Sequence, residues 1–242
     1  MKLDDALSVW EDFRGVLGDS VNVQIPATTN NILEVDIGPV GWRGYPRDKS
    51  KLSLYFLWMR KVKALKDAGI DLDSNSTSVV DIGCGNGMFA SLVGTDTYLG
   101  LDLVDAHISR CKKAFPNRTF VKLDFKNGLY GKGTLDPINF KIPRDDNSVH
   151  AIMCNSLFTH IGQPAVVERY LGEMDRVLVK GGCAYTTWFR SPPNELDDGD
   201  GRTVYLESDI VNWLSRWEKV SATEGETTQH DDQWETLYRK IK

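Results

Sequence analysis

The sequence has little cysteine and little histidine, and neither residue type is clustered. Four cysteines (Cys84, Cys111, Cys154 and Cys183) and four histidines occur among 242 residues, and no two cysteines form a CxxC pair. Neighbouring residues therefore cannot build a zinc knuckle or a thioredoxin-like redox pair. Reduced thiols and no bound metal are the expectation.

A long basic run and a long apolar run are missing as well. Lys and Arg total 29 against 34 Asp and Glu, which gives a net charge of -5, so no nucleic-acid partner is expected. The most apolar early stretch, residues 52–58, is too short to cross a bilayer, and the N-terminus shows no signal segment. We predict a soluble, cytoplasmic protein without a membrane partner, and the composition leaves its oligomeric state open.

What is present is an ordinary globular composition with 41% hydrophobic and 26% charged residues. The length sits at the upper end of one α/β domain, so we expect a single structural domain with an appendage. Residues 1–76 are predicted as a helical extension or lid, with helices at 3–17 and 50–68 around a Gly- and Pro-rich loop at 21–46. Trp42, Arg43 and Tyr45 of that loop either cover the active site or belong to a plain connector.

Short apolar runs alternate with helix-period segments from residue 77 to 242. This pattern is typical of strand–helix–strand units and a parallel sheet. Strands are predicted at 78–82, 97–102, 119–122, 149–155 and 182–189, and helices at 88–93, 106–115, 164–179 and 207–216. Two antiparallel strands, 217–224 and 233–241, are expected at the end. An acidic loop at 197–200 precedes the last predicted helix.

The sharpest feature is an apolar strand that runs into a glycine-rich turn and then a helix, over residues 79–90. Glycines let the backbone approach a ligand closely, and a helix start offers unpaired N–H donors. A dinucleotide fingerprint, GxGxxG, requires its third glycine at position 88, where this chain has Met88; the glycine is Gly87 instead. The spacing therefore argues against a dehydrogenase that binds a nicotinamide dinucleotide.

This turn resembles the first motif of class I S-adenosylmethionine-dependent methyltransferases, an acidic residue followed by GxGxG, here Asp81, Gly83, Gly85 and Gly87. The resemblance continues through residues 99–102, 120–125, 142–161 and 169–182, in the order and spacing of that family. It covers about residues 77–188. It implies a Rossmann-like α/β fold: a seven-stranded, mostly parallel sheet with an antiparallel last strand and helices on both faces.

The resemblance also implies S-adenosyl-L-methionine as cofactor and a set of residues that bind it. Asp102 would accept hydrogen bonds from both ribose hydroxyls, and Asp124 would take the adenine amino group. Asp81 would hold the glycine turn, reach the methionine amino group, or do both. The predicted cofactor-binding residues are Asp81, Gly83, Gly85, Gly87, Asp102, Leu103, Asp124, Phe125 and Asn155. Asp124 is alternatively a turn residue, and Phe125 either packs the adenine or belongs to the core.

His160 is the candidate catalytic base, because it follows the fourth predicted strand and imidazole titrates near neutral pH. A structural histidine is the alternative. Trp188, Phe189 and Arg190 are placed to line an acceptor pocket, with core packing as the alternative for Trp188. The Ser-Leu-Phe-Thr-His segment at 156–160, followed by a strand that ends Thr-Thr-Trp-Phe at 186–189, resembles methyltransferases that act on sugars or other small hydroxylated molecules.

Two other functions stay open. The same cofactor fold could methylate nitrogen, on a small amine or a protein side chain. A binding module that has lost catalysis is the third possibility, although Asp102 and the glycine turn are intact.

Overall fold

The sheet that carries the glycine turn is built from strands whose apolar residues alternate between two covered faces. In the computed structural model, residues 23–24, 34–35, 50–127, 131–191, 203–224 and 233–242 are described. The chain divides between Lys61 and Val62 into two units, and each is treated by itself. The predicted helix at 3–17, residues 42–45 and the acidic loop at 197–200 lie outside the described residues.

In the first unit, β1 (Val23–Gln24) pairs antiparallel with β2 (Glu34–Val35), so the segment predicted as a loop at 21–46 contains two short strands. Helix α2 (Ser50–Asp67) begins in this unit and matches the predicted helix at 50–68 to within one residue. Whether residues 1–76 form a separate extension or lid stays a prediction.

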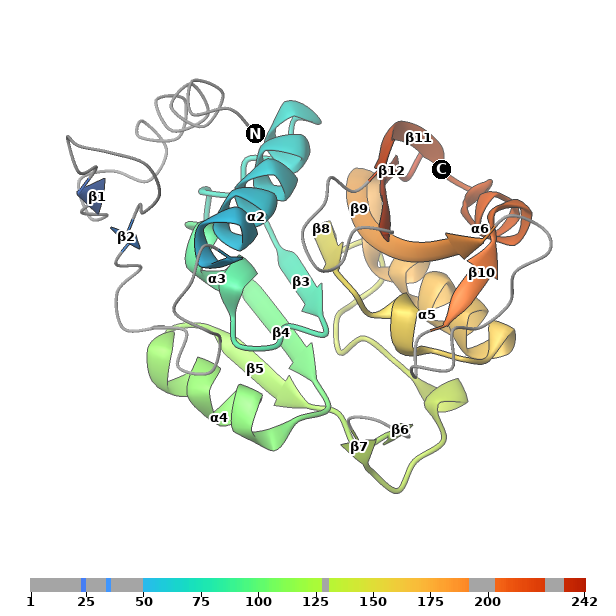
Figure 1. The fold of residues 1–242 in the computed structure, drawn as a ribbon, viewed down its shortest axis with the longest axis horizontal. Coiled ribbons are helices and arrows are strands. Elements are labelled where there is room, and N and C mark those ends of the chain that lie inside the picture. Colours follow the sequence, from blue (N-terminus) through green and yellow to red (C-terminus); the bar gives the residue numbers. More distant parts are fainter. Residues whose placement is uncertain (1–22, 25–33, 36–49, 128–130, 192–202, 225–232) are drawn as a thin grey trace. The chain divides into compact units, whose positions relative to one another are not determined.

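The second unit is a mixed sheet (Figure 1). Its strands are β3 (Val79–Ile82), β4 (Tyr98–Asp102), β5 (Thr119–Lys122), β8 (Val149–Cys154), β9 (Leu178–Ser191), β11 (Glu218–Glu224) and β12 (Gln233–Arg239). Their order is β11-β12-β9-β8-β3-β4-β5, and β12 runs antiparallel to both of its neighbours. The predicted mostly parallel sheet with an antiparallel last strand is therefore confirmed, and one further short strand brings it to eight strands where seven were predicted.

Helices connect the strands and cover both faces of the sheet. They are α3 (Met88–Leu92), α4 (Asp105–Ala114), α5 (Pro164–Val177) and α6 (Glu207–Leu214), with 3-10 turns η3 (Pro137–Asn139) and η4 (Phe158–His160). Three short strands were not predicted: β6 (Lys126–Asn127) and β7 (Gly131–Lys132), which pair with each other, and β10 (Val204–Leu206), which adds parallel to β9.

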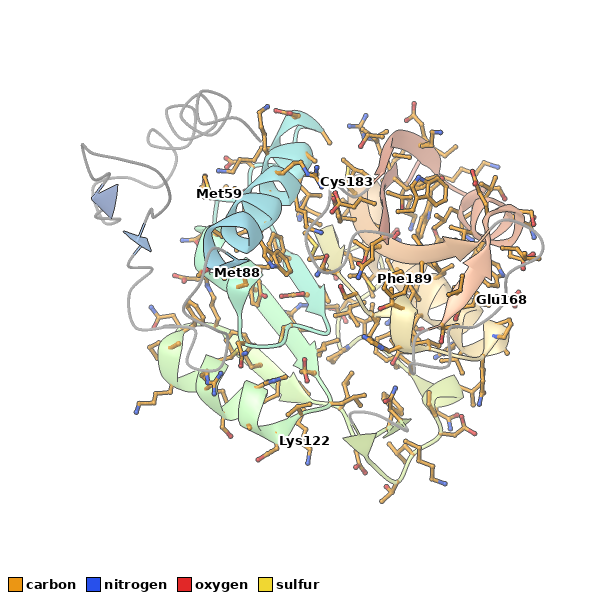
Figure 2. All side chains as sticks on the ribbon, viewed as in Figure 1. Met59, Met88, Lys122, Glu168, Cys183 and Phe189 are labelled. Atoms are coloured by element: carbon orange, nitrogen blue, oxygen red, sulfur yellow. The ribbon has the colours of Figure 1, made fainter. Side chains whose placement is uncertain are left out.

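One face of the sheet packs on α5 and α6 and forms the main hydrophobic core. Val80, Leu101 and Ile152 of the strands lie in one buried cluster with Leu171 of α5 and Leu214 of α6. Trp213 of α6 also donates from Nε1 to Oε1 of Glu168 on α5 at 3.2 Å, and Glu168 is labelled in Figure 2. Because these apolar side chains are buried on one face of the sheet, the alternate residues of each strand, including Asp81 and Asp102, lie on the opposite face.

The opposite face of β3 and β4 is covered by α3 and α4. Phe89 of α3 lies 6.3 Å from Tyr98 between ring centroids, and Phe115, which follows α4, lies 6.1 Å from Phe120 of β5. Arg118 spans this layer: its guanidinium donates to the carbonyl oxygens of Ala90 and Val93 at the end of α3. The end of α3 is thereby tied to the start of β5.

No helix in the described parts of the chain is long and apolar enough to span a membrane. The cytoplasmic location stays a prediction.

Candidate functional site

The glycine turn between β3 and α3 has three glycines in the left-handed region. The φ angles are 79° at Gly83, 51° at Gly85 and 82° at Gly87. A β-carbon on Gly87 would come within 3.0 Å of Cys111 Sγ and of the Phe115 ring, whereas one on Gly85 would meet no described atom within 4 Å. Gly87 is thus required by packing on α4, and Gly85 leaves the turn open for close approach.

Asp102, at the carboxyl end of β4, ties the second motif to the glycine turn. Its side chain is buried, and Oδ2 accepts from the Gly85 N–H at 2.8 Å. Oδ1 accepts from the Val104 N–H at 2.8 Å and lies 3.3 Å from His107 Nδ1. An ionised carboxylate has about four acceptor positions, so capacity for a further hydroxyl donor remains. His107 was not predicted, and only its place on the first turns of α4 could have indicated it.

Asp81 of β3 lies on the same face of the sheet as Asp102 of β4 and is almost completely buried. Tyr98 of β4 donates its hydroxyl to Asp81 Oδ2 at 2.5 Å. Burial raises the pKa of Asp81 to about 7; the Tyr98 hydrogen bond lowers it in part, and the negative charge of Asp102 raises it further. No local pattern indicates Tyr98 as the partner, because the contact arises only from the parallel pairing of β3 with β4.

Asp124 and Phe125 lie beyond β5, where the chain enters the unpredicted β6–β7 hairpin. The exposed Asp124 accepts from the Thr134 hydroxyl at 2.7 Å and from the Thr134 N–H at 3.3 Å. Phe125 is buried, with its ring edge-on to Phe140 at 6.0 Å between centroids. Leu103 is partly buried and packs against the same core cluster. Asp124 thus binds within its own loop and Phe125 packs in the core in this structure, and the assignment of both to the adenine stays a prediction.

Asn155 and Ser156 form a corner where the chain leaves β8. Ser156 has φ +54°, which is uncommon for a residue other than glycine, and its N–H donates to Thr187 Oγ1 at 2.6 Å. The Asn155 amide donates to Ser156 Oγ at 3.3 Å, and Ser156 Oγ donates to Gln233 Oε1 at 3.1 Å. Thr187 and Gln233 were not predicted as site residues.

His160 closes η4, one turn after this corner. Its N–H donates to the Leu157 carbonyl at 2.9 Å, its carbonyl accepts from the Asn127 amide at 3.3 Å, and the residue is partly buried. Trp188 is buried on the core face, with its ring stacked on Phe158 at 4.2 Å between centroids. Core packing is therefore the correct alternative for Trp188. The side chain of Arg190 lies outside the described residues.

The described residues contain no group of three or more His, Cys, Asp or Glu side chains that could hold a metal ion. The four cysteines are free and buried. Cys111 Sγ donates to the Gly85 carbonyl at 3.4 Å, so this thiol supports the back of the glycine turn.

The geometry fits an S-adenosylmethionine site. The open turn at Gly85, the buried carboxylate of Asp102 beside it and the buried carboxyl of Asp81 lie at or next to the carboxyl ends of adjacent parallel strands. Ligands of open α/β sheets bind at this edge. Asp102 is suited to hydroxyl groups and Asp81 to a cationic group.

Comparison with known proteins relates the region of the glycine turn to methyltransferases. Residues 80–186 match the family described as "Methyltransferase domain". Among solved structures, the chain is similar to the N-methyltransferase NodS from Bradyrhizobium japonicum WM9 in complex with S-adenosyl-L-homocysteine. The identity is 12% and the TM-score 0.59, over 85% of this chain and 94% of that one.

A second similar structure is an S-adenosylmethionine-dependent methyltransferase from Clostridium acetobutylicum ATCC 824, with 12% identity and a TM-score of 0.52 over 80% of this chain and 99% of that one. At such identities the likeness concerns the fold. Together with the family match over residues 80–186 and the motifs of the glycine turn, it supports a class I S-adenosylmethionine-dependent methyltransferase with S-adenosyl-L-methionine as cofactor.

Proposed function

We propose that the enzyme methylates a hydroxyl group of a small molecule, with sugars as the first class to test. The observation that carries this is the corner after β8, where the hydrogen-bonding side chains of Ser156, Thr187 and Gln233 are all uncharged. Uncharged donors and acceptors of this kind match hydroxylated ligands, which both donate and accept hydrogen bonds.

The cofactor, when bound, supplies an electrophilic methyl group on a sulfonium. The protein must mainly align the acceptor and exclude water, because the displacement is direct. Asp102 is assigned to the ribose hydroxyls, Asp81 to the amino group of the methionine moiety, and Gly83, Gly85 and Gly87 to close backbone approach. Leu103, Asp124, Phe125 and Asn155 complete the predicted cofactor site.

A hydroxyl acceptor has to lose its proton, and His160 is the proposed base. The position supports this assignment: η4 starts two residues after Ser156, so the imidazole is carried by the segment that follows the corner. Loss of a general base lowers turnover by about a hundredfold or more. His160→Ala should therefore lower kcat at saturating donor by at least that factor, and a fall of less than about threefold would show that His160 is structural.

The first experiment is calorimetric titration with S-adenosylmethionine. Asp102→Ala should weaken binding by about 1–3 kcal/mol, because a charged hydrogen-bond acceptor for the ribose is lost. Asp105→Ala is the matched control, since that carboxylate lies three residues on and its side chain is 75% exposed. Equal affinities in both variants would reject the assignment of Asp102.

The acceptor is then sought by measuring release of S-adenosylhomocysteine with sugars, other small alcohols, small amines and peptides. Turnover with hydroxylated compounds supports the proposal. Turnover with amines alone would replace it by N-methylation. Donor binding without turnover on any class would favour a non-catalytic module.

A further inference from the structure

The corner at Asn155 and Ser156 borders the glycine turn on the side opposite Asp102. Strands β3 and β8 pair in parallel with Asp81 opposite Met153, so the strand ends bring Gly83 level with Asn155. A β-carbon on Gly83 would lie 3.6 Å from Leu157 Cδ1, which confirms that the corner passes directly beside the turn. Asp102 lies on β4, the other neighbour of β3.

This placement indicates which part of the donor lies at which strand. The inference rests on the proposed function, in which Asp102 binds the ribose. With the ribose at Asp102 on β4, the part of the donor that crosses β3 towards β8 is the sulfonium end. The corner after β8 therefore faces the methyl group to be transferred and the acceptor that takes it.

The conformation of the corner is imposed by two other strands. Ser156 lies in the left-handed region, which a serine adopts at an energetic cost that its surroundings must offset. Its N–H is held by Thr187 of β9 at 2.6 Å and its hydroxyl by Gln233 of β12 at 3.1 Å. Both partners are buried, Thr187 with 0% and Gln233 with 8% of its surface exposed. Buried hydrogen bonds of this kind specify one geometry.

Thr187 and Gln233 reach the corner because β12 is inserted next to β9. The register places Gln233 opposite Phe189, which is labelled in Figure 2, and Glu235 opposite Thr187. Both side chains therefore belong to the same end and the same face of these strands. The inserted strand delivers its first residue to the place where the methyl group is transferred.

We propose that Thr187 and Gln233 are positioning residues for methyl transfer: they hold Ser156 in its left-handed conformation and so set the acceptor side of the donor site. They act through the backbone of the corner and not by contact with the ribose end. Their loss should change recognition of the transferred group while the binding of the rest of the cofactor is retained.

The test compares two ligands that differ at the transferred group. One is S-adenosylhomocysteine, which lacks the methyl group, and the other is the S-adenosylmethionine analogue in which an amine-bearing carbon replaces the methyl-bearing sulfonium. Both dissociation constants are measured by calorimetry, so no acceptor is needed. If the wild-type protein bound neither ligand, the proposed donor site itself would be wrong.

Thr187→Val removes the oxygen that accepts from Ser156 at nearly constant volume. We expect the affinity for the amine analogue to fall about five- to tenfold, the equivalent of one hydrogen bond, with the affinity for S-adenosylhomocysteine within about twofold. Thr187→Ser, which keeps the hydroxyl, should restore the ratio of the two constants. Gln233→Met should also lower the affinity for the amine analogue relative to that for S-adenosylhomocysteine. The double variant Ser156→Ala with Gln233→Met should show about the same relative affinity as either single variant.

Thr186→Val is the matched control. Thr186 is the preceding residue of β9, equally buried, and its hydroxyl pairs with that of Thr236 at 2.6 Å on the core face. This variant should lose stability and leave the ratio unchanged. The proposal is overturned if Thr187→Val leaves the ratio unchanged, weakens both ligands equally, or behaves like Thr186→Val.

Discussion

Asp81 should make donor binding depend on pH, because its carboxyl group is buried beside Tyr98 and has a pKa of about 7. A cationic group of the donor requires the ionised carboxylate, so binding below pH 7 has to remove a proton from Asp81. The dissociation constant of S-adenosylmethionine should then fall about tenfold for each pH unit from 5.5 to 6.5 and level off above 7.

The raised pKa of Asp81 also determines how the stability of the protein without ligand depends on pH. The folded-state pKa is raised above the unfolded value of 3.8, so the folded protein binds the extra proton between these two values. Stability from this group is therefore fully present below about pH 4 and is lost as the pH rises through 7. A shift of about three pKa units corresponds to about 4 kcal/mol in total, and to about 2–3 kcal/mol between pH 5 and pH 7.5.

The assay is calorimetric titration at pH 5.5, 6.5 and 7.5 in two buffers with different ionisation enthalpies, which counts the protons released on binding. Asp81→Asn cannot ionise and should bind weakly with no pH dependence over this range. In urea unfolding, the difference in stability between wild type and Asp81→Asn should move in favour of the variant as the pH rises. A wild-type dissociation constant that is the same at pH 5.5 and 7.5 would refute the reasoning.

Two further predictions concern stability. Gly87→Ala should lower the free energy of unfolding in urea by about 2–4 kcal/mol, because a positive φ is combined with contact to the thiol and ring behind the turn. The control Gly69→Ala, at φ +87° with no atom within 4 Å of the added β-carbon, should lower it by only about 1 kcal/mol. Equal losses of stability in the two variants would contradict this prediction. Burial raises the pKa of Glu173, but hydrogen bonds and charges, chiefly those of Arg176, outweigh burial and hold it below its usual range. The stability that Glu173 contributes is thus present above about pH 4.5 and lost at lower pH. Glu173→Gln should lower the free energy of unfolding by about 2–4 kcal/mol at pH 7, against less than about 1 kcal/mol for Asp146→Asn, whose carboxylate is exposed. Losses of similar size would show that the buried Glu173–Arg176 ion pair contributes no more than the exposed one.

Local sequence pattern was sufficient to predict the strands and helices around the glycine turn. β3, β5, α3 and α4 fall within two residues of their predicted bounds, because strand-like and helix-like periodicities alternate along this part of the chain. β9 shows the limit of this reasoning. It begins at Leu178 and not at 182, since Gly181 and Gly182 pair with Lys240 of the inserted strand's end, a contact between distant segments.

The site could be predicted only where one segment carries its own chemistry. Motifs suffice to nominate Asp81 and Asp102, but their partners Tyr98 and His107 depend on strand register and helix placement. Ser156 is the clearest case: nothing in its neighbours indicates a left-handed conformation, because the residue that binds its hydroxyl is 77 positions away.

The insertion of β12 between β9 and β11 has a consequence for the order of folding. While the chain is being synthesised, β9 lacks its antiparallel neighbour until residues 233–239 have been made. Until then one long edge of the sheet carries unpaired backbone groups, and edges of this kind attract other chains. Closure of the sheet is thus expected as a late event that depends on distant pairing, and the same strand then brings Gln233 to Ser156.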